Sequence, residues 1–325
     1  MKKIIAMGEG LIDFIPMQTG CEIKDVESFS GRVGGAPCNV AAMAAKLGGD
    51  SAMISMLGKD GFGDKIVETL NSVGVDTTAV LRTDKANTAL AFVSLQKDGN
   101  REFSFYRKPS ADMLMSADDI NEKWFSNAGI FHFCSVALIP SPMREAHIKA
   151  LDIARQNNMF ISFDPNLRFP LWDDKELLKE TVLEFLKYAD LTKISDEELE
   201  FITGHTDISS AAKMLFDNYP KLKAILYSEG KKGASIYTRN FMVSSKQYPV
   251  RAIDTTGAGD CINGAFLYKL AEADITPDTF ENADSGFIQS SLDFANACSS
   301  LSVTQNGAIS SYPDMKQLME FIKKY

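Results

Sequence analysis

Residues 254–260 read Asp-Thr-Thr-Gly-Ala-Gly-Asp, and an apolar stretch, Cys261–Leu267, follows directly. Gly257 and Gly259 allow the backbone to turn tightly and to point several N–H groups in one direction. The apolar stretch predicts a helix, and its N-terminus adds partial positive charge at the same place. The segment therefore predicts an anion hole with a carboxylate, Asp260, at its edge. Such a site suits phosphoryl transfer to an alcohol, where catalysis depends on positioning and charge stabilisation.

A second glycine turn, Gly34-Gly35-Ala36-Pro37-Cys38-Asn39, opens another predicted helix near Asn39. Adjacent glycines allow a ligand to approach the backbone closely, and the Asn39 amide can donate to and accept from hydroxyl groups. Simpler alternatives are helix caps, with Asn39 capping one helix and Asp260 the other. Asp13, near the start of the chain, is a further polar candidate, although it could be a carboxylate at an exposed strand edge.

Composition limits the class of protein. The chain has 325 residues, 45% hydrophobic and 24% charged, as in a globular protein with a sizeable core. A net charge of −9 argues against nucleic-acid and anionic-membrane partners, and no segment approaches the length of a membrane span. We expect a cytoplasmic protein with reduced thiols, because the five cysteines are scattered and form no C-x-x-C pair. The cysteines and three histidines show no zinc-type cluster.

Strand-like apolar runs alternate with helical periodicities, which predicts βαβ units and a mainly parallel sheet. The predicted strands are Lys3–Met7, Ser51–Met56, Ile130–Cys134, Met159–Asp164, Leu191–Ile194 and Ala224–Ser228. The predicted helices are Asn39–Leu47, Gly63–Val73, Pro142–Asn157, Asp174–Tyr188, Asp196–Thr203, Gly259–Ala273, Pro277–Leu301 and Pro313–Lys324.

Two segments interrupt this alternation, and we expect them to form an accessory sheet. Residues 11–33 look extended and lack helical periodicity. Thr88–Gln96 and Arg101–Arg107 are rich in β-forming residues and flank Lys97–Asn100, whose Asp-Gly pair is a strong hairpin signal. Because no Pro- or Ser-rich linker divides the chain, we expect a single domain, residues 1–325.

The two glycine motifs, about 220 residues apart, resemble the two signatures of the ribokinase (pfkB-type) carbohydrate kinases. The resemblance covers nearly the whole chain and points toward fructokinases through Phe103–Leu114, Asp164–Arg168 and Lys193–Gly204. It implies a ribokinase-like three-layer α/β/α core with a mainly parallel sheet, plus a small β-sheet lid formed by about residues 11–33 and 87–110. It also implies ATP-dependent phosphorylation of a sugar primary hydroxyl, most directly of D-fructose to fructose 6-phosphate.

The same resemblance implies roles for individual residues. It implies that Asp260 is the base and that the N–H groups of Gly257, Ala258 and Gly259 form the anion hole. For the sugar it implies Asp13, Gly34, Gly35 and Asn39, and we place Arg107 and Arg168 near the substrates. Contacts to ATP are expected from Asn166, Ser228, Gly230, Gly233, Thr256, Gly257, Gly259 and Asn296. Mg²⁺ is expected to bind Glu198 through water, and Asp254 and Ser311 match segments that hold K⁺ in many relatives.

Several of these positions have structural alternatives. The family's Asn-x-x-Glu motif has Ser195 in its first place, and Ser195 followed by Glu198 also reads as a helix capping box. Residues 228–233 also fit a hairpin turn, and Asp164-Pro165-Asn166 equally fits a turn. Each of the two arginines could be a surface or inter-strand residue.

Other functions fit the same motifs. A 2-keto-3-deoxygluconate kinase, or another sugar kinase of the family, would need basic contacts for a carboxylate, which Arg107 and Arg168 could supply. A non-catalytic sugar- or nucleotide-binding regulator is disfavoured by the intact Asp260 and anion hole. The sequence has no P-loop, protein-kinase or dinucleotide-binding motif. The family also contains dimers formed lid to lid, so an exposed lid edge would favour a homodimer.

Overall fold

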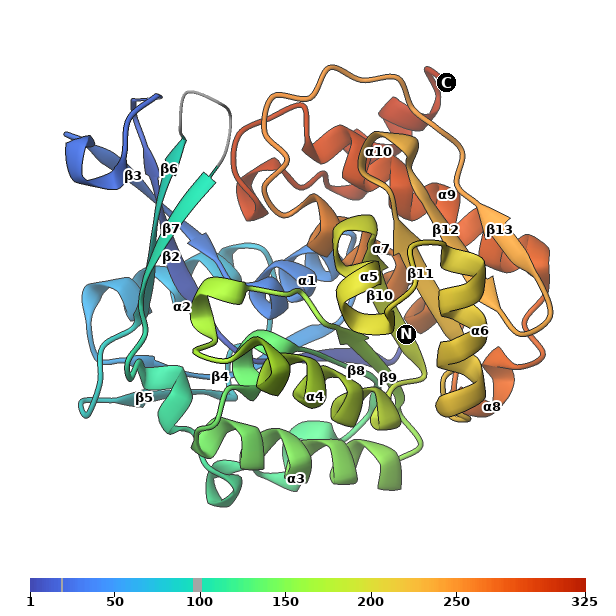
Figure 1. The fold of residues 1–325 in the computed structure, drawn as a ribbon, viewed down its shortest axis with the longest axis horizontal. Coiled ribbons are helices and arrows are strands. Elements are labelled where there is room, and N and C mark those ends of the chain that lie inside the picture. Colours follow the sequence, from blue (N-terminus) through green and yellow to red (C-terminus); the bar gives the residue numbers. More distant parts are fainter. Residues whose placement is uncertain (19, 96–100) are drawn as a thin grey trace.

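The computed structural model describes residues 1–18, 20–95 and 101–325, and a nine-stranded sheet forms its centre (Figure 1). The strand order is β13-β12-β11-β10-β9-β8-β1-β4-β5. The strands are β1 Lys3–Met7, β4 Ser51–Gly58, β5 Val80–Thr83, β8 Ala128–Cys134, β9 Phe160–Asp164, β10 Leu191–Ser195, β11 Ala224–Ser228, β12 Ala234–Thr238 and β13 Met242–Ser244. Neighbours from β11 to β5 are parallel, and β12 and β13 are antiparallel. The predicted, mainly parallel sheet is confirmed.

Helices cover both faces of this sheet, so the core has three layers (Figure 1). They are α1 Ala36–Lys46, α2 Gly61–Ser72, α3 Pro142–Gln156, α4 Lys175–Phe185, α5 Asp196–Thr203, α6 Ile208–Asn218, α7 Ala258–Glu272, α8 Pro277–Phe280, α9 Ser285–Ser302 and α10 Met315–Ile322. Along β1, Ile4 and Ala6 pack into the core with α1, α7 and α9, whereas Ile5 and Met7 pack into the core with α3 and α4. This alternation shows why the central strands are apolar throughout.

Two helix predictions are wrong at their boundaries. The helix expected from Asn39 begins at Ala36, because Gly35 is the N-cap and Pro37 fits the first turn, so Asn39 is not a cap. The stretch expected as one helix, Pro277–Leu301, is two helices. The break occurs where Asp284 accepts hydrogen bonds from Gly286 and Phe287 N and starts α9.

A second, four-stranded sheet stands beside the central one (Figure 1). Its order is β3-β2-β6-β7, with β2 Leu11–Pro16, β3 Phe29–Gly34, β6 Ala89–Leu95 and β7 Arg101–Tyr106. β3 and β7 are antiparallel to their neighbours, and the two central strands, β2 and β6, are parallel. The accessory sheet is therefore confirmed, while the predicted turn at Lys97–Asn100 lies outside the described residues. Within the described chain, none of the helices has the length and apolarity needed to cross a bilayer.

Candidate active site

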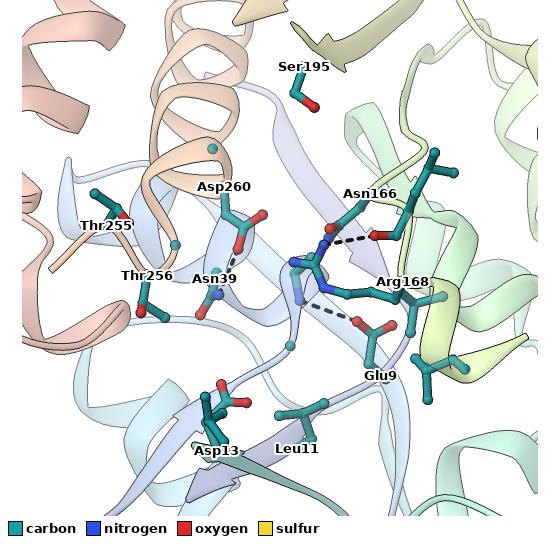
Figure 2. A pocket seen from close by; sticks show the side chains of 18 of the residues that line it. Glu9, Leu11, Asp13, Asn39, Asn166, Arg168, Ser195, Thr255, Thr256 and Asp260 are labelled. Atoms are coloured by element: carbon teal, nitrogen blue, oxygen red, sulfur yellow. Dashed lines mark hydrogen bonds between the residues drawn. The ribbon is translucent and has the colours of Figure 1, made fainter. Parts of the chain in front are cut away.

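A cavity of about 630 Å³ lies between the small sheet and the carboxyl ends of the central strands. Such an edge is where open α/β sheets bind ligands. Figure 2 shows Asp13 on the small sheet at one side, Asn39 and Asp260 facing each other, and Asn166 and Arg168 opposite them. The cavity therefore joins the two glycine motifs, which are far apart in sequence.

The N-terminus of α7 forms one wall of this cavity. Gly257 is the N-cap with φ of 74°, and a methyl group there would lie 2.6 Å from Tyr312 Oη, so only glycine fits. Ala258 N donates to Thr255 O at 3.2 Å, whereas the N–H groups of Gly257 and Gly259 donate to no other residue that the structure describes. Two donors with no partner among the described residues, at a helix N-terminus, suit the binding of an anion.

Asp260 lies inside this helix, at its third residue, so its interpretation as the N-cap is wrong. Asn39 Nδ2 donates to Asp260 Oδ2 at 2.8 Å and joins α1 to α7. The pKa of Asp260 is raised to about 6, chiefly by burial and also by the charge of Asp164, while Asn39, Lys193 and Arg168 oppose the rise. The carboxylate is thus more basic than usual but still ionised at neutral pH.

The neighbours of Gly34 and Gly35 explain why glycine is needed at both positions. A methyl group on Gly34 would lie 2.1 Å from Asp13 Oδ2, and one on Gly35, which has φ of 104°, would lie 2.4 Å from Glu9 O. Asp13, Gly35 and Asn39 line the cavity. Asn39 Oδ1 is buried and has no partner among the described residues, so it can accept a hydrogen bond from a ligand.

The two predicted arginines differ in their surroundings. Arg107 is buried, pairs with Asp112, and donates from Nη1 to Val136 O at 2.9 Å. It is not among the described residues that line the cavity, so its contact with substrate stays a prediction. Arg168 is exposed at the cavity, where its guanidinium donates to Leu167 O at 3.1 Å (Figure 2).

The residues predicted to bind ATP fall into two groups. Asn166 and Thr256 line the cavity with Gly257 and Gly259. Ser228, Gly230 and Gly233 lie in the hairpin from β11 to β12, which confirms that this segment is a turn. A methyl group on Gly233 would be 3.6 Å from Asn296 Nδ2, so this hairpin adjoins Asn296 on α9. The described structure places this second group outside the lining of the cavity.

Glu198 forms the capping box that its spacing predicts. Its Oε2 accepts from Ser195 N at 2.9 Å, and its Oε1 accepts from Leu167 N at 2.7 Å. Glu198 also lines the cavity. Because both oxygens already accept backbone hydrogen bonds, the carboxylate fits a metal held through water better than a direct metal bond.

The two segments predicted to hold K⁺ lie together. Asp254 accepts from Thr256 N and from Gly307 N, both at 2.9 Å, and so ties its own turn to the loop that precedes Ser311. Ser311 Oγ donates to Ala308 O at 2.9 Å. In the described parts of the chain, no group of three or more His, Cys, Asp or Glu side chains is arranged to hold a metal.

A buried ion pair to which the sequence assigns no role lies beside Asp260. Lys193, on β10, donates from Nζ to both carboxylate oxygens of Asp164, on β9, at 3.0 and 3.2 Å. Glu9 was also missed; it is buried at the cavity, accepts from Ala36 N at 3.3 Å, and has its pKa raised to about 7, chiefly by burial. The sequence does carry a signal for these residues, because each is a charged residue in or next to a strand that is expected to be buried.

A parallel α/β sheet, an anion hole at a helix N-terminus and a carboxylate beside it define a phosphotransferase with an alcohol acceptor. Residues 1–315 match the pfkB family carbohydrate kinases, and the chain belongs to this family. The chain is 39% identical over 321 residues to fructokinase-1 of Zea mays, which covers 99% of this chain and 98% of the maize protein.

Solved structures show the same similarity. The fructokinase of Xylella fastidiosa with bound ATP superimposes with a TM-score of 0.91 and 32% identity, covering 99% of this chain and 98% of that chain. A double mutant of the fructokinase of Vibrio cholerae O395, with fructose, ADP and a potassium ion bound, gives a TM-score of 0.86 and 31% identity, covering 99% and 98%. The expected family and fold are confirmed.

Proposed function

We propose that this chain is an ATP-dependent fructokinase that makes fructose 6-phosphate from D-fructose. The observation that carries the proposal is Asp260, held at 2.8 Å by Asn39 beside the N–H groups of Gly257 and Gly259, which donate to no described residue. Relatives with bound ATP, or with fructose and ADP, have the same fold. A base next to an anion hole is the arrangement that phosphoryl transfer to a hydroxyl requires.

In the proposed reaction, the primary hydroxyl of the sugar lies beside Asp260. Asp260 accepts the hydroxyl proton as the sugar oxygen bonds to the γ-phosphorus and the bond to ADP breaks. The N–H groups of Gly257 and Gly259 stabilise negative charge on the γ-phosphoryl oxygens. Ala258 N already donates to Thr255 O, so its predicted part requires that bond to weaken. Asn39 fixes the orientation of the carboxylate.

Cations complete the proposed site. Mg²⁺, when bound with ATP, would neutralise charge on the phosphate oxygens, and the buried Glu198 fits a contact through water. Asp254 and the loop containing Ser311 would hold K⁺, and the hydrogen bond from Gly307 N to Asp254 keeps these two segments together. We expect added K⁺ to raise activity if this second site is occupied.

The surroundings of Arg107 favour a neutral sugar over 2-keto-3-deoxygluconate. Asp112 pairs with its guanidinium, and the charge of Glu9 acts on the same group. A guanidinium already paired with a carboxylate offers little to a substrate carboxylate. Of the two arginines, only Arg168 lines the cavity among the described residues.

We further propose that residues 11–33 and 87–110 act as a lid in a single domain. Leu11, Asp13, Ile15, Val93 and Phe105 face the cavity from this sheet, where closure would exclude water.

The opposite face of the same sheet is aromatic, with Phe14 stacked on Phe92 and Tyr106 64% exposed. Such an exposed apolar face supports a homodimer formed through the lids. Light scattering of the wild type and of Tyr106→Glu tests this, and a wild-type monomer would exclude the dimer.

ADP formation measured against several acceptors tests the function. We expect ADP to form with fructose at a kcat/KM at least about tenfold above that for ribose, 2-keto-3-deoxygluconate or a nucleoside. The assay is run with and without K⁺, and fructose 6-phosphate is identified as the product. A preference for 2-keto-3-deoxygluconate would overturn the choice of fructose. Absence of any sugar-dependent ADP would overturn the kinase assignment and favour a binding protein.

A further inference from the structure

Lys193 is a buried cation that lines the cavity. Its side chain is 8% exposed, and its partner, Asp164, is the last residue of β9. The ammonium group also lies beside the anion hole, because a methyl group on Gly259 would be 3.1 Å from Lys193 Cε and 3.3 Å from Nζ. Lys193 thus lies between a fixed carboxylate and the N-terminus of α7.

The charges around the cavity make this position unusual. Its described lining has two cations, Arg168 and Lys193, and six carboxylates, those of Glu9, Asp13, Glu197, Glu198, Asp254 and Asp260. ATP would bring further negative charge into this space, and like charges repel. Arg168 is exposed, so solvent weakens its field, whereas the buried Lys193 acts where the dielectric constant is low.

Lys193 remains charged in this environment. Burial alone would lower its pKa, but the carboxylates of Asp164, Glu198 and Asp260 raise it well above the ordinary value for lysine. An ammonium group has three N–H donors, and its two hydrogen bonds to Asp164 leave it the capacity for a third. Asp164 itself is held by Asn166 N at 3.0 Å, so the pair is fixed from both sides.

We propose that Lys193 is a catalytic residue that binds the transferring γ-phosphoryl group, and that Asp164 is a positioning residue that holds its ammonium group beside Gly259. This inference rests on the proposed kinase function. Lys193 donates to a γ-phosphoryl oxygen while the sugar oxygen–phosphorus bond forms and the bond to ADP breaks. The positive charge offsets the carboxylates around the cavity at the point where phosphoryl charge is greatest.

A structural role predicts a different pattern of mutant effects. If Lys193 only neutralises Asp164, then Lys193→Met is damaging because it leaves a buried carboxylate unpaired. Removing both charges, in Lys193→Met with Asp164→Asn, would then restore activity as well as stability. If Lys193 binds the phosphoryl group, the double variant regains stability but stays inactive.

The chain offers a matched control at the other end of the same strands. Asp190 directly precedes β10, is buried, accepts from Ile161 N at 2.8 Å, and pairs with Arg155 at 3.2 Å. Neither residue is among those that line the cavity in the described structure. Arg155→Met with Asp190→Asn therefore removes a comparable pair without touching the proposed site.

The test measures thermal stability, kcat and the sugar KM for the wild type, the single variants and both double variants. We expect Lys193→Met to lower kcat about 100-fold or more, with the sugar KM changed less than about threefold. The Lys193→Met/Asp164→Asn variant should melt near the wild type and keep the low kcat, while the control pair keeps a wild-type kcat. Recovery of kcat in that double variant, or an equal loss in the control pair, would overturn the proposal.

A binding measurement separates this proposal from the kinase function. Lys193→Met should weaken a non-hydrolysable ATP analogue about tenfold or more, and ADP less than about threefold, because ADP lacks the γ-phosphate. Equal weakening of both nucleotides, or of neither, would overturn the role of Lys193. Sugar-dependent ADP formation by the wild type tests the kinase function independently.

Discussion

The molecule contains two glycine turns that each open a buried helix, and they differ in how the first N–H groups of the helix are used. Gly35 starts α1 with φ of 104°, and Gly257 starts α7 with φ of 74°. At α1, Glu9 accepts from Ala36 N, and the next residue, Pro37, has no N–H group. At α7, the N–H groups of Gly257 and Gly259 have no described partner. Helix N-termini bind anions only where their donors are available.

Under the proposed function, this difference would place the two substrates on two sides of the cavity. α1 contributes a side chain, Asn39, whose amide can bind hydroxyl groups. α7 contributes backbone donors, which suit phosphate oxygens, and Asp260, which suits proton transfer. The hydrogen bond from Asn39 to Asp260 joins the two sides where the hydroxyl would meet the phosphoryl group.

Removing the carboxylate of Asp260 should have the largest effect on activity. Asp260→Ala is expected to lower kcat about 100- to 10,000-fold while changing the sugar KM less than about threefold, because the base acts in the transition state. Steady-state ADP formation measures both constants. Asp13→Ala is the control on the sugar side of the cavity, and this variant should raise the sugar KM. Activity of Asp260→Ala within a few-fold of the wild type would contradict the role of Asp260 as base.

Adding a methyl group at each glycine turn should affect a different kinetic constant on each side of the cavity. Gly34→Ala places it 2.1 Å from Asp13 Oδ2, so we expect the sugar KM to rise about tenfold. Gly259→Ala places it 3.1 Å from Lys193 Cε at the anion hole, so we expect kcat to fall by about the same factor. Both constants are measured with fructose and ATP varied in turn. If both variants raise only the sugar KM, the assignment of α7 to the phosphate is wrong.

The same comparison shows what sequence could predict. The central strands β1, β4, β8, β9, β10 and β11 were predicted because strands buried on both faces are continuously apolar. The short edge strands β5 and β13 were missed, since half-exposed strands lack that pattern. The helix α6 was also missed, although its buried residues Ala211, Ala212, Leu215 and Phe216 have helical spacing.

The glycine turns and Asp260 were also predictable, because glycine leaves a local signature at a turn. The ion pairs Lys193–Asp164 and Arg107–Asp112 were not. The first depends on β9 and β10 lying side by side, which follows from the tertiary fold rather than from spacing. The second depends on how residues 107–112 fold back on themselves after β7.

The pH dependence should shift when Asn39 is removed. Asp260 must be ionised to accept a proton, so kcat/KM for the sugar, which reports the free enzyme, should fall in the wild type as the pH drops below about 6. The hydrogen bond from Asn39 lowers the pKa of Asp260, so Asn39→Ala should raise that pKa and move the acid limb to higher pH. Profiles of kcat/KM for the sugar from pH 5 to 9 measure the shift. A limb that stays in place or moves to lower pH contradicts this coupling.

Glu9, which occupies the N-terminus of α1, should show a smaller effect, on stability alone. Its pKa is raised to about 7 in the folded chain, chiefly by burial, so the folded state binds a proton more tightly than the unfolded state. The contribution of Glu9 to stability should therefore fall as the pH rises from about 4.5 to 7, by at most about 3 kcal/mol. Glu9→Gln keeps an oxygen to accept from Ala36 N but removes the charge. The free energy of unfolding of the variant, relative to that of the wild type, should therefore increase as the pH rises through this range. Urea unfolding at pH 5 and pH 8 measures the gain, and an equal difference at both pH values would show that the Glu9 carboxylate is not destabilised by its burial at α1.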